Sequence, residues 1–419
     1  MIDFLRKRKE LFLFFLYVTP LCVFLQSLNF ATTNAYAAFY ILLTAGLLLM
    51  KGFCKNNTKS LLLTFFFVIM ICLMGISAEW LAVMQTLLLL LYLHTKASED
   101  LYGIDKLSNI ILLLGVVCAI FCIVELVNFP FYASLILPLY KPEVSTVIQT
   151  LYVSGGMCGT MPQTADAAGI ILNSFYVLVV LRGNTISKFW KITIGFLLIV
   201  GLFLTAKRAH LFFGLAIWLF SYIITSSNKK RIKNLLIITF TIAISIPILV
   251  NVAPKLGEKN VLSEIIFSFQ NISTDQEEVM HGRNYLYEMA WKKVEEAPLT
   301  GHGWGSFKKT VDYRGGATDV HNVYLQLWAE SGIFMLILYV FVLSSLIIKT
   351  IKIARFYGAL GNKYERVTSL LRFSFCIQGF FILYCFTGNC LYNISFFSMY
   401  ILAVSIMLAA NRKKQLSYT

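Results

Sequence analysis

The chain has 419 residues, of which 58% are hydrophobic and only 14% are charged. Soluble domains are about 45–50% apolar and about 25% charged, so this composition excludes an ordinary soluble protein. The formal net charge of +15 does not by itself indicate a nucleic-acid partner, because Lys and Arg accumulate in the cytoplasmic loops of membrane proteins and orient the chain.

The nine cysteines lie mostly inside apolar segments, where a thiol behaves as a small hydrophobic group. No CxxC pair occurs, and no Cys and His residues have the spacing of metal ligands. The sequence therefore predicts neither a disulfide framework nor a zinc site, and we expect no metal and no cofactor.

Apolar segments recur along the chain, each close to the ~20 residues that a helix needs to cross a membrane. The first follows the basic RKRK stretch at 6–9 and lacks a small-residue cleavage site, so we expect it to remain as a span. The segment FPFYASLILPLY at 129–140 is too short and too rich in proline to cross, and it indicates an interfacial or re-entrant piece. The fold class is therefore an all-α polytopic membrane protein. Its twelve predicted spans lie near residues 11–28, 33–50, 61–77, 80–93, 107–127, 166–181, 189–206, 209–225, 234–252, 323–348, 371–388 and 391–410.

Most basic residues fall on one side when the spans are counted from a cytoplasmic N-terminus, which also makes the C-terminus cytoplasmic. These basic loops lie at 6–9, 51–59, 182–188, 229–233, 349–372 and 412–414. The turn TAKRAH at 205–210 breaks the pattern, because the count places it on the external face. Such charges at the end of a span indicate a functional site with an anionic partner. The alternative is that Lys207 and Arg208 extend toward lipid headgroups.

One large external loop at 253–322 separates an N-terminal bundle, 1–252, from a C-terminal bundle, 323–419. Within the loop, RNYLYEMAWKKVEEAPLTG has apolar residues at helical spacing, and Pro298 and Gly301 end the predicted helix. The GHGWGSF turn, 301–307, follows it.

A second polar cluster marks the start of the tenth predicted span. His321 lies near Asp319 at the external interface, which is a suitable place for a general base. The alternative, of equal weight, is that the TDVHN stretch has no role beyond capping the helix, with Asp319 or Asn322 supplying the cap oxygen. Glu330 lies within the span, where a carboxylate is costly and normally faces a polar cavity or a cation, and Glu125 raises the same possibility.

Three segments resemble the bacterial O-antigen ligase and O-antigen polymerase superfamily: LTAKRAHL (204–211), HGRNYLYEMAWKKVEEAPLTGHGWGSF (281–307) and HNVYLQLWAESG (321–332). The last has the His-Asn, nine residues, Gly pattern described for the ligases. In the ligases a small or hydroxyl residue usually follows three positions after this Gly, and Met335 departs from that pattern. In the C-terminal half the resemblance consists of these motifs. In the N-terminal half it consists only of the number of predicted spans.

The resemblance implies a GT-C-like, metal-independent, inverting glycosyltransferase on the external face of the bacterial cytoplasmic membrane. Its donor would be a saccharide on undecaprenyl pyrophosphate. Arg208 and Arg283 match the pyrophosphate-contacting positions of the family, and His321 matches its essential base. Fixed cations can stabilise the charge of a departing pyrophosphate. The other candidate substrate-binding residues are Lys207, Asp319, Asn322 and Glu330.

The motifs AKRAHL and HNVYLQLWAESG resemble those of capsule-type polymerases. This resemblance favours a repeat-unit polymerase of surface polysaccharide, whose acceptor is another lipid-linked repeat unit. The alternative is an O-antigen ligase, which transfers the glycan to lipid A–core. A lipid-linked glycan transporter or flippase is a more distant alternative, but a transporter should have two similar halves, and none are visible. The expected partners are the lipid bilayer, the donor, the acceptor and a chain-length regulator, with no nucleic acid. No role is predicted for His210, His281 or His302.

Overall fold

The computed structural model describes residues 101–182, 186–225, 283–313 and 316–416, together with positions 28, 64–66, 68, 90 and 92–94. The first four predicted spans, the span at 234–252 and the loop up to residue 282 thus lie almost entirely outside the described residues.

The described chain is almost entirely helical. Its first half contains α7 (Leu101–Val127), α8 (Phe129–Ile136), η2 (Leu137–Leu139), α9 (Pro142–Val153), α10 (Thr164–Tyr176), η3 (Val177–Leu181), α11 (Lys188–Leu204) and α12 (Arg208–Thr225). Its second half contains α16 (Arg283–Glu296), α17 (Ser306–Thr310), α18 (Val323–Ala359), η5 (Asn362–Tyr364), α19 (Glu365–Tyr384) and α20 (Ile394–Leu416). The strands β1 (Asp312–Tyr313) and β2 (Gly316–Ala317) form a small antiparallel hairpin.

Five described helical segments are long and apolar enough to cross a membrane. They are Leu107–Val127, Thr164–Leu181, Val323–Ala359, Glu365–Tyr384 and Ile394–Lys414. The helices α11 and α12 correspond to two further predicted spans, and the Phe129–Leu139 segment is short, as expected. The structure is therefore that of a helical membrane protein, and the total of twelve spans stays a prediction.

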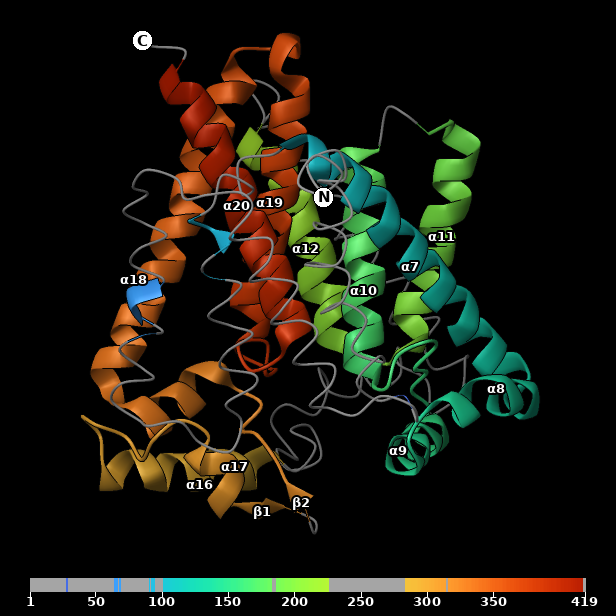
Figure 1. The fold of residues 1–419 in the computed structure, drawn as a ribbon, viewed down its shortest axis with the longest axis vertical. Coiled ribbons are helices and arrows are strands. Elements are labelled where there is room, and N and C mark those ends of the chain that lie inside the picture. Colours follow the sequence, from blue (N-terminus) through green and yellow to red (C-terminus); the bar gives the residue numbers. More distant parts are fainter. Residues whose placement is uncertain are drawn as a thin grey trace, which may run out of the picture.

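The long helices that the structure describes run along the longest axis of the molecule as a bundle (Figure 1): α7, α10, α11, α12, α18, α19 and α20. Within it, α10 packs against α7, and α19 packs against α12, α18 and α20. Small residues allow the close approaches that membrane helices need. A Cβ on Gly201 of α11, for example, would lie 2.5 Å from the Cβ of Ala119 on α7.

The two ends of the bundle differ in character. The short helices α8, α9, α16 and α17 and the β hairpin gather at one end, whereas α20 ends at the other (Figure 1). The last turns of α20 carry Lys413 and Lys414, so a cationic segment lies at the end away from the short helices. We call the end with the short helices the capped end.

Helix α18 is broken at Gly332, which has φ 77° and ψ 172°. This backbone region is open essentially to glycine alone. The GHGWGSF turn fills the break, because the backbone N–H groups of His302 and Gly303 donate to the carbonyls of Ala329 and Glu330 at 3.1 and 2.9 Å. Gly332, the glycine of the His-Asn, nine residues, Gly pattern, is therefore the position at which the GHGWGSF turn hydrogen-bonds to the tenth predicted span.

We expect Gly332→Ala to destabilise the protein by at least about 1–3 kcal/mol, from backbone strain alone. The added Cβ would also overlap the carbonyl oxygen of Leu299. Thermal unfolding of the purified protein in detergent measures the loss. Gly361 is the matched control, since it has φ 79° but open space around a Cβ. An equal loss of stability in Gly361→Ala would contradict the importance of the contact between Gly332 and the GHGWGSF turn.

Candidate functional site

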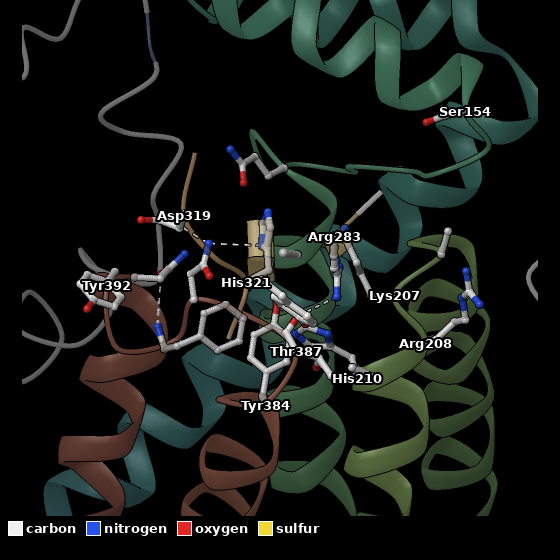
Figure 2. Close-up of a pocket in the computed structure, with 18 residues that line it drawn as sticks. Ser154, Lys207, Arg208, His210, Arg283, Asp319, His321, Tyr384, Thr387 and Tyr392 are labelled. Atoms are coloured by element: carbon white, nitrogen blue, oxygen red, sulfur yellow. Dashed lines mark hydrogen bonds between the residues drawn. The ribbon is translucent and has the colours of Figure 1, made fainter. Parts of the chain in front are cut away.

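A cavity of about 830 Å³ lies at the capped end of the bundle. Five stretches of chain contribute its lining residues, at 154–165, 206–210, 283–287, 319–321 and 384–396. Polar and charged side chains from these stretches converge on it (Figure 2). We call this space the central cavity.

The central cavity brings together the three cations predicted to bind an anion. Lys207 and Arg208 line it from the TAKRAH turn, and Arg283 lines it from the first residue of α16. The Arg283 guanidinium is held from the α19–α20 connection, since its Nη1 donates to the backbone carbonyl of Thr387 at 3.2 Å (Figure 2). Residues distant in sequence thus form one positively charged wall.

The TAKRAH turn has a conformation that presents these cations at a helix N-terminus. Ala206 has φ 56°, in the left-handed region, and α12 begins two residues later at Arg208. The positive end of the helix dipole favours an anion at this position. Burial and the nearby charge of Arg283 lower the pKa of Lys207.

The predicted base, His321, lines the same cavity and has φ 59°. Left-handed backbone is uncommon for a residue other than glycine, although His adopts it more readily than most. Asn389 lies beside it, with Nδ2 3.3 Å from the His321 Nδ1 and also 3.3 Å from the Asp319 Oδ2. Gln326 holds the turn before α18 in place. Its Nε2 donates to the Asp319 Oδ1 at 3.0 Å, and its Oε1 accepts from the Val320 N–H at 3.1 Å.

The electrostatics of the cavity keep His321 neutral. Burial, followed by the charges of Arg283 and Lys207, lowers the pKa of His321 to about 4. A neutral imidazole can accept a proton, which is the property a general base needs. A bound pyrophosphate would offset the two cations and so raise the basicity of the ring.

Two predicted substrate-binding residues do not line the central cavity. The Asn322 Oδ1 accepts from the Leu325 N–H at 3.1 Å and caps α18. Glu330 is fully buried, and its carboxylate accepts from Gln326 at 3.2 Å, from Tyr392 at 3.0 Å and from the backbone N–H of Phe307 at 3.4 Å. Both residues therefore hold the surrounding structure, and contact with substrate would require their movement.

We expect Glu330→Gln to keep the fold and most of the activity, because an amide oxygen can still accept hydrogen bonds at this position. Glu330→Leu leaves buried donors unpaired, at about 1–3 kcal/mol for each group, and should lower the unfolding temperature clearly. Thermal unfolding and turnover of both variants test this. Loss of turnover in Glu330→Gln at an unchanged unfolding temperature would mean that the carboxylate acts on substrate directly.

The other acid singled out in the sequence, Glu125, also has a structural position. It is fully buried in α7, and its Oε2 accepts from the backbone N–H groups of Cys158 and Gly159 at 2.8 Å each. These bonds anchor the connection between α9 and α10, which supplies Ser154 and Gln163 to the cavity lining.

Of the histidines without a predicted role, His210 borders the central cavity. Its ring is fully buried, at 4.5 Å from the ring of Tyr384 and 5.0 Å from that of Phe380 between centroids. Neither ring nitrogen has a hydrogen-bond partner among the described residues. His302 lies elsewhere, with Nε2 2.9 Å from the carbonyl of Lys293, and His281 lies outside the described residues.

Sequence reasoning missed the contribution of the α19–α20 connection and of Gln326 in α18. Asn389, Tyr392 and Asn393 line the cavity, and Gln326 positions Asp319. Polar amides in or beside apolar spans were the available signal, but their partners lie far away in the sequence. Within the described residues, no group of three or more His, Cys, Asp or Glu side chains could hold a metal ion.

Comparison with known proteins points to one family. Residues 193–340 match the family model described as O-antigen ligase. This stretch contains the TAKRAH turn, α16 and the start of α18, and with them the three cavity cations and His321. No curated protein matches the chain. The matched segment, about a third of the chain, and the helical membrane fold support its similarity to the O-antigen ligase and polymerase superfamily.

Proposed function

We propose that the protein transfers a glycan from undecaprenyl pyrophosphate to a saccharide acceptor in the central cavity, as a repeat-unit polymerase of surface polysaccharide. The transfer is metal-independent and inverts the anomeric configuration. The observation that carries this proposal is the convergence of Lys207, Arg208, Arg283 and His321 on one cavity at the end of a membrane bundle.

The cationic wall fits the pyrophosphate of the donor. As the bond between the anomeric carbon and the pyrophosphate oxygen breaks, negative charge grows on the leaving group. Arg283 can offer a planar pair of N–H donors to this charge, and Lys207 can offer a point charge. Donors that are already fixed need no reorganisation during the reaction, which is the main source of such stabilisation.

The part of the cavity around His321 fits the acceptor. An acceptor hydroxyl attacks the anomeric carbon from the face away from the pyrophosphate and passes its proton to the Nε2 of His321. This requires the Nδ1 to carry a proton and to donate it to the Oδ1 of Asn389 after a flip of the amide. The Asn389 Oδ1 is buried and has no partner among the described residues, so this acceptor is available. The flip gives up the bond from the Asn389 Nδ2 to the Asp319 Oδ2, so Asn389 alone then positions the ring.

The location proposed for the site is the external face of the bacterial cytoplasmic membrane. The distribution of cations supports this, because basic residues near Lys413 and Lys414 end α20 on the side away from the capped end. Lys and Arg outside the membrane concentrate on the cytoplasmic side. The central cavity draws on all three predicted parts of the chain, 1–252, 253–322 and 323–419, so we expect none of them to act alone.

The acceptor distinguishes a polymerase from a ligase. Met335, the residue that departs from the ligase pattern, is buried within α18 and does not line the cavity, so the departure leaves the chemistry of the site unchanged. The test is a transfer assay with purified protein, a labelled lipid pyrophosphate-linked repeat unit, and two competing acceptors. We expect longer lipid-linked chains. Transfer to lipid A–core would establish the ligase, and no transfer to either acceptor would contradict the enzyme.

A further inference from the structure

The connection between α19 and α20, residues 385–393, holds two of the groups on which the proposed reaction depends. The Thr387 carbonyl accepts from the Arg283 guanidinium at 3.2 Å, and the Asn389 side chain lies 3.3 Å from His321. The same short connection therefore contacts both Arg283 and His321. Any covalent constraint on this segment would act on both at once.

Two cysteines of this connection flank Thr387 and Asn389. Cys385 follows the end of α19, Cys390 lies five residues later, and their Sγ atoms are 3.0 Å apart. A disulfide bond has a length of about 2.03–2.05 Å, so the sulfurs need to approach by only about 1 Å. Both residues are fully buried, and they border Tyr339, whose Oη is 3.5 Å from the Cys385 Sγ.

We propose that Cys385 and Cys390 are a modification site at which an intrachain disulfide closes the 386–389 loop. The proposal rests on the external location of the site under the proposed function, because disulfides persist in oxidising compartments and not in the cytoplasm. It runs against the expectation from the sequence, which predicted no disulfide framework.

The chemistry balances with an exported thiol oxidoreductase as the oxidant. One cysteine thiolate attacks the disulfide of the oxidoreductase to give a mixed disulfide, and the second thiolate displaces the enzyme from it. The two thiols lose two protons and two electrons, and the oxidoreductase disulfide becomes two thiols. Because both sulfurs are buried in the folded chain, the bond forms before α19 and α20 pack, and burial then shields it from reductants.

The bond restricts the loop that carries Thr387 and Asn389, so its expected effect is on the placement of Arg283 and His321. Holding a site in its productive geometry before substrate arrives reduces the ordering cost of binding. Loss of the bond should therefore reduce turnover several-fold, by about 3–10-fold, and leave the helices of the bundle in place.

The decisive experiment is mass spectrometry on the full-length protein from its own membrane. The sample is acid-quenched, denatured and treated with N-ethylmaleimide, with or without prior reduction. The tryptic peptide 373–412 contains Cys376, Cys385 and Cys390, so Cys376 is an internal control. We expect one adduct, on Cys376, without reduction and three adducts after it. Three adducts without reduction would overturn the proposal.

A second arm measures turnover of Cys385→Ala, Cys390→Ala and the double variant, each with its unfolding temperature. If the two residues form one bond, each single variant loses as much turnover as the double variant. Losses that add would contradict a bond between them. The adduct count does not depend on activity, so a failure of the glycosyl-transfer proposal would show as absent transfer with the adduct pattern unchanged.

Discussion

Arg283→Ala should lower kcat/KM for the lipid-linked donor by about 10²–10³-fold, which is the usual cost of removing one fixed donor from a developing negative charge. The side chain lines the central cavity and is fixed by its bond to the Thr387 carbonyl. No covalent chemistry is assigned to it, so the whole loss is electrostatic. The measurement is initial-rate kinetics with the labelled donor, at fixed ionic strength.

Arg283→Lys separates charge from geometry. Lysine keeps the positive charge but cannot offer two parallel N–H donors to a phosphate, so we expect an intermediate loss of about tenfold. The unfolding temperature of both variants shows whether α16 still packs against α18. Full activity in Arg283→Ala would remove the guanidinium from the mechanism.

His321→Ala should reduce kcat by about 10²–10⁴-fold, the range that general acid–base catalysis contributes. Donor binding should change little, because the cations proposed to hold the pyrophosphate are separate from the ring. Equilibrium binding of the lipid pyrophosphate donor, measured beside turnover, tests this division. A His321→Ala variant that loses donor binding and turnover in equal measure would place the imidazole on the pyrophosphate instead.

The pH dependence of the wild-type protein gives an independent check on His321. Burial and the charges of Arg283 and Lys207 lower its pKa to about 4, and a base must be unprotonated to act. In the free protein, kcat/KM should therefore stay level as pH falls through 6.5, the ordinary value for His, and should decline only near pH 4. A decline centred near pH 6.5 that His321→Gln abolishes would contradict the electrostatic description of the cavity.

The sequence was sufficient to predict the helices and the cations because these follow from local rules. The described spans that were predicted near 107–127, 166–181, 323–348, 371–388 and 391–410 all coincide with membrane-length helices. A span is recognisable from about 20 residues of its own composition. The TAKRAH turn stood out for the same local reason, since its charges oppose the pattern of the other loops.

Other features of the site depend on contacts between segments distant in sequence, and no local pattern reveals them. Glu330 was expected to face a cavity or a cation, yet its partners include Tyr392 and the Phe307 N–H, which the fold brings to it. Asn389 gained its importance only when α19 and α20 placed it beside His321. The break at Gly332 was likewise invisible, because glycine inside an apolar run has many possible reasons.

The central claim is that the cavity bounded by the TAKRAH turn, α16 and the α19–α20 connection holds the pyrophosphate of the donor. Photocrosslinking tests it most directly, with an undecaprenyl pyrophosphate analogue that carries a diazirine on the isoprene unit next to the pyrophosphate. Peptides that contain residues 204–211, 283–291 or 384–396 should carry the label, and excess unlabelled donor should prevent it. Competable labelling confined to the opposite end of the bundle, near Lys413, would contradict the account.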